Sequence, residues 1–336
     1  MHTTQWLLEG DPAIRWQVLQ DLEDADPDAV ARERARVARE GWGAALLAAR
    51  GPDGQWAGGA HFPKAEPVLP GQPWTSTSHV LTELRLLGVD PADPVVRDAI
   101  ADVARVTHWE YDDEPFFEGE VEPCINAALV TNARYFGVEV DAIVERLLGE
   151  RMADGGWNCD QERGSVRSSF DTTIGVLEAL AAFEREHDDP RVREARESGE
   201  EYLLERGLMR RRSTGEIPKP TYVQLAFPPR HEYDVLRALE HFRAVGALVD
   251  ERMREAIDVV RSKRRDDGTW AADVVHGGDA VVDYGAAGEP SRWITLKALR
   301  VLRWADGEAQ VAASPDAAAT DASAPGASGP DASAPR

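Results

Sequence analysis

The chain has 336 residues, 43% of them hydrophobic, and carries a formal net charge of −22 at pH 7. Such acidity disfavours nucleic acid as a partner, because a phosphate backbone would be repelled. No apolar run approaches the roughly 18 residues of a membrane span, and the N-terminal segment lacks the basic and apolar regions of an export signal. The two cysteines, Cys124 and Cys159, are too few for a disulfide framework. We therefore expect a cytoplasmic protein with no integral membrane segment.

Two kinds of helix alternate along the chain, and strand signals are scarce. One kind is apolar around most of its circumference and is expected over residues 12–24, 75–88, 123–137, 171–184, 232–246 and 291–304. The other kind has a single apolar stripe and is expected over residues 29–50, 94–106, 141–152, 189–207 and 250–265. A helix that is apolar all round is buried, and a helix with one stripe covers it. The alternation predicts an inner and an outer layer of helices.

The regular return of the inner helices predicts a single all-α domain over residues 1–307. We expect an (α/α)6-like toroid, in which helix hairpins form a ring around a central cavity. Residues 308–336 are rich in Ala, Ser, Pro, Asp and Gly and contain no aromatic residue. Such a composition cannot bury enough surface to offset the entropy of ordering, so we expect a disordered tail there.

Three phrases of similar form separate outer helices from later inner helices: GPDGQWAGG at 51–59, ADGGWNCD at 153–160 and RDDGTWAAD at 265–273. Their glycines supply a helix stop and a turn with positive φ. The indole suits a wedge between hairpins, because it buries a large rigid surface and leaves one N–H to satisfy. We interpret the phrases as structural joints and not as a ligand-binding motif.

The repeated tryptophan and glycine of these phrases resemble the terpenoid cyclase and protein prenyltransferase toroid superfamily. The residues that carry the resemblance are Gly54-Gln55-Trp56, Gly155-Gly156-Trp157 and Gly268-Thr269-Trp270, each followed by an inner helix led by Ser or Thr. More narrowly, the chain looks like the short bacterial squalene cyclase-like proteins that have one toroid. The resemblance covers residues 1–307. It implies the toroid fold and a small hydrophobic or isoprenoid substrate in the central cavity.

Class II cyclases of this superfamily place an Asp-x-Asp-Asp motif at the start of an inner helix, and its central aspartate protonates the substrate. The nearest match here is Ser168-Ser169-Phe170-Asp171-Thr172-Thr173, with Asp171 in the place of the last aspartate. Phe170 then stands where the catalytic acid is expected. Asp171 is the remaining candidate acid, although an aspartate in the first turn of a helix is also an ordinary cap.

Protein prenyltransferases of this superfamily bind zinc through Asp, Cys and His from separate inner-helix starts. Cys124, Cys159 and His231 lie at or near such starts, so the resemblance makes them candidate metal ligands. No CxxC or HxxH spacing supports the site, and a buried free cysteine is usually a small hydrophobic residue. We therefore expect no cofactor, with zinc or magnesium as the alternative.

Two further stretches carry candidate site residues. In FFEGEVEPCIN, Glu120 and Glu122 alternate before a helix and could form an acidic wall, or favour the helix N-terminus. In PPRHEYD, His231, Tyr233 and Asp234 form a possible proton-handling set, which capping would explain equally well. The candidate catalytic residues are Asp171, His231, Tyr233 and Glu122. The candidate substrate-binding residues are Glu120, Cys124, Asn126, Asp160, Asp234, Arg292 and Trp293.

These observations leave three functions open. The first is a terpenoid cyclase-like or prenyltransferase-like enzyme that acts on a small isoprenoid or lipid. The second is a non-catalytic toroid that binds a ligand or a protein and has lost the class II acid. The third is a carbohydrate-active α/α enzyme, which requires two carboxyl groups about 5–10 Å apart across a groove.

Overall fold

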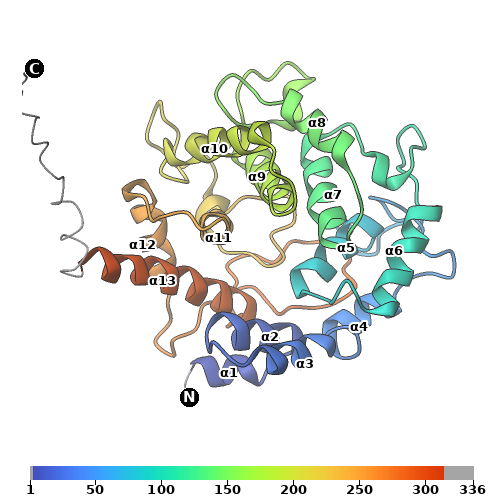
Figure 1. Cartoon of the computed structure of the whole chain (residues 1–336), viewed down its shortest axis with the longest axis horizontal. Coiled ribbons are helices and arrows are strands. Elements are labelled where there is room, and N and C mark those ends of the chain that lie inside the picture. The colour runs from blue at the N-terminus through green and yellow to red at the C-terminus, as the bar shows by residue number, and fades with distance from the viewer. Residues whose placement is uncertain (1–2, 314–336) are drawn as a thin grey trace, which may run out of the picture.

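The computed structural model describes residues 3–313, with side chains described to residue 307. Within this range there are thirteen α-helices and four short 3₁₀ helices, and no strand (Figure 1). The expected all-α class is confirmed. The α-helices are α1 (Thr3–Leu8), α2 (Pro12–Asp21), α3 (Pro27–Ala35), α4 (Gly41–Ala48), α5 (Thr77–Leu87), α6 (Pro94–Val106), α7 (Pro123–Tyr135), α8 (Asp141–Gly149), α9 (Phe170–Glu184), α10 (Pro190–Leu204), α11 (Val235–Ala244), α12 (Arg254–Ser262) and α13 (Arg292–Ala313).

Six helices contact one another in a series that closes on itself. Helix α5 packs on α7, α7 on α9, α9 on α11, α11 on α13 and α13 on α2 (Figure 1). Hydrogen bonds join α2 back to α5, because Trp16 Nε1 donates to Leu87 O at 2.9 Å and Gln17 Nε2 donates to Leu86 O at 3.2 Å. These six helices correspond to the six apolar segments of the sequence. The remaining helices pack on them from the outside, as α10 does on α9 and α12 on α11 and α13.

Four helices begin with the same dipeptide. An aspartate caps the first turn and proline follows at the first helical position in α2, α3, α6 and α10, whose caps are Asp11, Asp26, Asp93 and Asp189. The carboxylate accepts a hydrogen bond from a free backbone N–H of the first turn, and proline removes one donor that would have no partner. The sequence therefore fixes these starts locally.

The segment 29–50 forms two helices instead of the single outer helix expected. Gly41 begins α4 with a φ of +62°, and a Cβ there would lie 1.8 Å from Asp11 Oδ2. The Asp11 carboxylate caps α2 through Ala13 N and also accepts from Trp42 N, both at 2.8 Å. The chain turns at Gly41 because this aspartate serves two helices at once.

The three Gly-x-Trp phrases form joints with one geometry. In each joint the indole N–H donates at 2.7 Å to the carbonyl ten residues earlier, from Trp56 to Leu46, Trp157 to Leu147 and Trp270 to Val260. The backbone N–H of the same tryptophan donates to the hydroxyl of a threonine on the next inner helix, which is Thr77, Thr173 or Thr295. All three indoles are fully buried. Each joint thus ties an outer helix to the start of the inner helix that follows.

The central joint shows how closely its indole packs. Trp157 lies between α9 and α10, and a Cβ added to Gly199 of α10 would stand 2.8 Å from both the indole and the Leu177 side chain. Glycine at this position lets the two helices close around the ring. Packing of this density makes the joint sensitive to any change in the shape of the indole.

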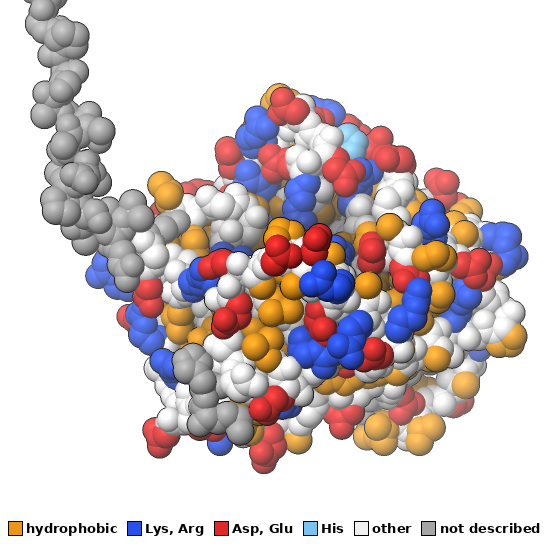
Figure 2. Space-filling model, turned by 60° about the horizontal axis from the view of Figure 1, so that its bottom comes forward, with side chains coloured by type: hydrophobic (Ala, Val, Ile, Leu, Met, Phe, Trp, Pro, Cys, Tyr) orange, Lys and Arg blue, Asp and Glu red, His pale blue; other side chains and the backbone are white. Residues whose placement is uncertain are grey.

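The end of the chain departs from the expected boundary. Helix α13 continues to Ala313, six residues into the segment expected to be disordered from 308, and residues 314–336 lie outside the described range. None of the helices between residues 3 and 313 combines the length and the apolar character needed to cross a membrane. On the face shown in Figure 2, acidic and basic side chains are interspersed, with hydrophobic ones between them.

Replacing Trp157 by phenylalanine is expected to lower the free energy of unfolding by about 2–3 kcal/mol, since it leaves Leu147 O without its donor and creates a void. Urea unfolding followed by circular dichroism measures the change. Trp6→Phe is the matched control, because Trp6 is only half-buried, and should cost less than about 1 kcal/mol. Equal losses in the two variants would contradict the structural role of the joint.

Candidate functional site

A cavity of about 260 Å³ lies at the N-terminal ends of the inner helices. Its wall includes residues at or just before the starts of α5, α7, α9 and α11, namely Ser78, Cys124, Asp171 and His231. The long loops before α5 and α13 meet beside it, because Trp74 N donates to Asp279 O and Trp74 Nε1 donates to Gly277 O. We call this space the first cavity.

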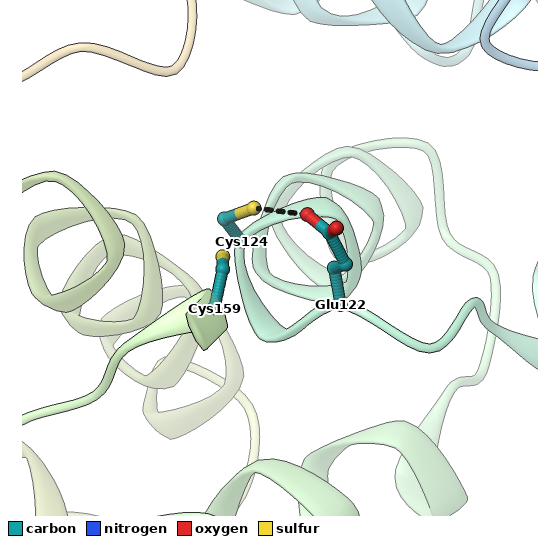
Figure 3. A group of neighbouring side chains, drawn as sticks. All are labelled: Glu122, Cys124 and Cys159. Atoms are coloured by element: carbon teal, nitrogen blue, oxygen red, sulfur yellow. Dashed lines mark hydrogen bonds between the residues drawn. The ribbon is translucent and has the colours of Figure 1, made fainter. Parts of the chain in front are cut away.

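Glu122, Cys124 and Cys159 converge on one wall of the first cavity (Figure 3). Their ligand atoms all lie within 4.8 Å of one another, and Cys124 Sγ is 3.6 Å from Glu122 Oε2. Cys124 and Glu122 line the first cavity, whereas Glu122 and Cys159 also line a neighbouring pocket of about 270 Å³. We call these three residues the thiol cluster. It lies between the two spaces, so both give access to it.

A hydrogen bond between the two thiols sets their acidities apart. It lowers the pKa of Cys159, which Thr172 lowers further, and it raises the pKa of Cys124 together with burial. Thr172 Oγ1 donates to Cys159 Sγ at 3.3 Å. Cys159 is therefore the more acidic of the two thiols, and a thiolate is the form of cysteine that binds metals.

The thiol cluster fits a thiophilic divalent metal ion. Zinc in proteins takes sulfur at about 2.3 Å and carboxylate oxygen at about 2.0–2.2 Å, so its ligand atoms lie within about 4–5 Å of one another. Three protein ligands leave a fourth position open, and Thr172 supplies an outer contact of the kind that orients a ligand. Residues Glu139, Asp141 and His187 form a second group within the described chain, but it contains no thiol and its two carboxylates are exposed.

Four histidines gather around Trp74 on the wall of the first cavity or beside it. The rings of His79, His231 and His276 lie 5.0, 6.0 and 6.2 Å from the Trp74 ring, and His61 lies 4.5 Å from His79. We call them the imidazole cluster. Gln72 Nε2 lies between His61 Nε2 and His79 Nε2, at 3.4 and 3.5 Å, and Ser78 Oγ is 3.1 Å from His61 Nδ1.

Burial favours the neutral form of three of these imidazoles, those of His61, His79 and His276. It lowers the pKa of His61 and His276, and lowers that of His79 further with the help of His61 and Arg230. A neutral imidazole is a proton acceptor near pH 7. His61 and His79 thus provide proton acceptors on the lining of the cavity that Glu122 and Cys124 also line.

Ion pairs form the inner end of the first cavity. Arg237 donates to both carboxylate oxygens of Glu178 at 2.8 Å, and despite burial the attraction of Arg237 lowers the pKa of Glu178 to about 2. Arg230 pairs with Glu83, which is 1% exposed and also accepts from Tyr284 Oη at 2.7 Å. Charged donors engage both carboxylates, so neither is free to act as a general acid.

Four of the predicted site residues line the first cavity: Glu122, Cys124, Asp171 and His231. Asp171 accepts from Lys219 Nζ at 2.6 Å and from Tyr233 N at 2.9 Å. Each of the two carboxylate oxygens therefore already has a donor, so the carboxyl group is not free to act on a substrate. Phe170 packs against Tyr202, Tyr222 and Tyr233 in the core.

The other predicted residues lie elsewhere. Tyr233 is buried and donates to Leu208 O, Asp234 caps α11, and Asn126 bonds to the Glu120 backbone through both its side-chain atoms. Asp160 pairs with Arg163, Arg292 Nε donates to Trp6 O, and Trp293 stacks on Phe227. His231 does not belong to the group that Cys124 and Cys159 form, where Glu122 takes its place.

Sequence reasoning missed His61, His79 and Trp74, which come from the loop and helix around the first joint. Their only signal in the sequence was one histidine thirteen residues before Trp74 and another five residues after it. It also missed Arg85, Glu178 and Arg237, which look like ordinary surface charges on helices in the sequence. In the structure their helices pack so that these side chains line the first cavity.

No protein-family model matches the chain, and neither does any curated protein. Among solved structures, a protein from Actinoplanes is similar at a TM-score of 0.44 and 17% identity, over 88% of this chain and 90% of that one. The type II terpene cyclase MstE from Scytonema is similar at a TM-score of 0.37 and 14% identity, over 82% of this chain and 99% of that one. The chain is thus distantly similar in structure to a terpene cyclase. A likeness at this level identifies no reaction.

The imidazole cluster predicts a loss of stability in acid. Folding lowers the pKa of His61 and His79, so the unfolded chain takes up protons first as the pH falls through about 6.5. The free energy of unfolding is expected to fall below that pH and to be independent of these groups above it. Urea unfolding between pH 5 and pH 8 measures the slope.

His79→Gln should flatten this slope, whereas His108→Gln, at a partly exposed position away from the cavity, should leave it unchanged. Identical slopes in the two variants would show that the imidazole cluster is not the source of the pH dependence.

Proposed function

We propose that the chain is a single α/α toroid and a metal-dependent enzyme of the prenyltransferase-like kind, acting on a small isoprenoid or other small lipid. The closed series of contacts among α2, α5, α7, α9, α11 and α13 supports the toroid. The thiol cluster carries the functional proposal, because a carboxylate and two thiols within 4.8 Å form a donor set at the wall of a cavity.

Glu122, Cys124 and Cys159 would hold zinc, which supplies a Lewis acid and lowers the pKa of a coordinated thiol or water. Thr172 orients Cys159 through its hydroxyl. His61 and His79 are neutral and can accept a proton from a substrate group that enters between the two clusters. We thus assign nucleophile activation to the thiol cluster and proton acceptance to the imidazole cluster, both of which have members on the lining of the first cavity.

The size of the first cavity limits the substrate. A volume of about 260 Å³ is just below the roughly 300–1,000 Å³ typical of small-molecule sites. Trp109, Phe116 and Leu129 supply an apolar surface for a short hydrocarbon chain. A C30 substrate does not fit this space.

Cation cyclisation is less well supported than metal-assisted transfer. A cyclase needs free aromatic faces to stabilise carbocations. Here Arg230 already covers Trp74 at 4.7 Å, and Trp109 stacks on Phe116 at 4.7 Å. Asp171, the remaining candidate acid, is bound to Lys219.

A carbohydrate-active enzyme is also less well supported. The acids that line the first cavity are Glu122, Asp171 and Glu178. All three are engaged in ion pairs, and the pKa of Glu178 is lowered to about 2, whereas a glycosidase needs one carboxyl with a raised pKa. The second candidate is a non-catalytic toroid that binds a ligand, which Phe170 at the acid position favours.

Cobalt substitution tests the metal site. The wild-type protein should bind one Co²⁺ with thiolate-to-cobalt absorption in the near ultraviolet, and purified protein should contain zinc by mass spectrometry. Cys124→Ser and Cys159→Ser should abolish the absorption, and Thr172→Val should weaken metal affinity by about 10–100-fold through the lost contact to Cys159.

His187→Gln alters the second group of possible ligands and is the control that should leave the cobalt spectrum unchanged. If the wild type binds no metal, or if Cys159→Ser binds it equally well, the metal-dependent function is wrong. If the wild type does bind the metal, the zinc-loaded protein is incubated with short prenyl diphosphates and the products are analysed by mass spectrometry. Formation of a product indicates an enzyme, and no product indicates a toroid that only binds its ligand.

A further inference from the structure

A second cavity, of about 460 Å³, lies toward the other end of the same helices. It is lined by residues from the C-terminal halves of α5, α7, α9 and α11 and from the first half of α13. It shares a wall with the first cavity, since Arg85, Glu178 and Arg237 line both. The thiol cluster and the imidazole cluster do not line it.

The second cavity is basic in an acidic protein. Eight of its lining residues are arginine or lysine and three are glutamate, although the whole chain carries a net charge of −22. The lining is positively charged whereas the whole chain is negatively charged. Either acidic partners in internal ion pairs or an anionic ligand can balance such a positive lining.

Internal ion pairs account for part of this charge. Arg237 is paired with Glu178 and Arg243 with Glu240, and Arg300 pairs with both Asp21 and Glu240. Arg134 and Arg230 pair in the same way, with Glu186 and Glu83. These five arginines need no further partner to balance their charge.

Three cations remain without an ion pair among the described residues. Arg85 donates only Nε, to Asn132 Oδ1 at 2.9 Å, which leaves both of its terminal nitrogens free. Arg185 is exposed at the rim of the cavity. Lys297 is 8% exposed and makes neither a hydrogen bond nor an ion pair through its ammonium group within the described chain.

Lys297 is the cation that the fold explains least. It lies in the second turn of the 22-residue helix α13. The negative C-terminal end of a helix stabilises basic residues in its last turn, so it does not stabilise the charge of Lys297. Burial lowers the pKa of Lys297, with Glu240 and Asp234 opposing that effect from beyond contact distance. A buried charge without a contacting partner is costly.

Hydrogen-bond donors also exceed acceptors here. The Nε atoms of Arg134, Arg230 and Arg300, three arginines of this lining, are buried and find no acceptor among the described residues. A ligand rich in acceptor oxygens would restore the balance by letting these side chains rearrange around it.

We infer that the second cavity binds a small multivalent oxyanion, of phosphate or carboxylate chemistry, held by Lys297, Arg85 and Arg185. The anion supplies the charge and the acceptors that this lining lacks. The site is separate from the thiol cluster and does not depend on a bound metal.

Calorimetric titration of the full-length protein tests this site, with inorganic pyrophosphate in one arm and citrate in the other, at low ionic strength. Saturable binding by either anion supports the inference, and the arm that binds more tightly identifies the chemistry. Affinity should fall as sodium chloride is added. If neither anion binds saturably, the inference is overturned.

Lys297→Met and Arg185→Gln should each weaken anion binding by about tenfold or more, because each removes a charge-assisted contact. Lys64→Met is the matched control, since Lys64 is exposed on the loop before α5 and far from this lining. Equal affinities in Lys297→Met, Arg185→Gln and Lys64→Met would overturn the proposed site.

The melting temperature without ligand gives a second measure. Because Lys297 is buried without a contacting partner, we expect Lys297→Met to melt at a higher temperature than the wild type. We also expect this variant to lose the increase in melting temperature that pyrophosphate produces in the wild type. A lower melting temperature together with an unchanged pyrophosphate response would show that Lys297 serves only to balance Glu240 and Asp234. Cobalt binding should be the same in wild type and Lys297→Met, which separates failure of this site from failure of the metal site.

Discussion

The indole hydrogen bond at each joint is the interaction on which the rest of the structure depends. The indole of a buried tryptophan donates to a carbonyl ten residues back, near the C-terminal end of an outer helix, and the backbone N–H of the same tryptophan donates to a threonine hydroxyl of the next inner helix. A carbonyl without a hydrogen bond at a buried helix end would be costly in free energy. The indole N–H supplies that hydrogen bond and also holds the outer helix against the joint. The same geometry recurs at Trp56, Trp157 and Trp270, so each of these three joints holds an outer helix beside the inner helix that follows it.

The position of the chemistry follows from that arrangement. Inner helices held by their first turns bring their N-terminal residues to one end, where Cys124, Asp171 and His231 meet, and their C-terminal residues to the other. Between the two ends, Glu178 and Arg237 form a buried ion pair within a charged layer. Such pairs are costly to break once they are buried. Within the described residues, this charged layer forms the wall that the first and second cavities share.

The groups that line the two cavities decide which chemistry the interior can support. An apolar tunnel lined by free aromatic faces would suit carbocation chemistry, whereas here Arg230 occupies the face of Trp74. The groups that remain available are thiols, neutral imidazoles and unpaired cations. These groups bind metals, accept protons and hold anions, which is the chemistry assigned to the two cavities.

Periodicity and turn residues determined the all-α class, the six inner segments and the joints, because a helix face and a Gly-Trp turn are local properties of neighbouring residues. They also placed Cys124 and Cys159 near helix starts. Only the tertiary structure decided that Glu122 completes their group, that Gly41 divides an outer helix, and that His61, His79 and Lys297 face cavities. Those positions depend on how segments far apart in the chain pack, as when Trp74 bonds to Gly277 across 203 residues, and no local pattern encodes such a contact.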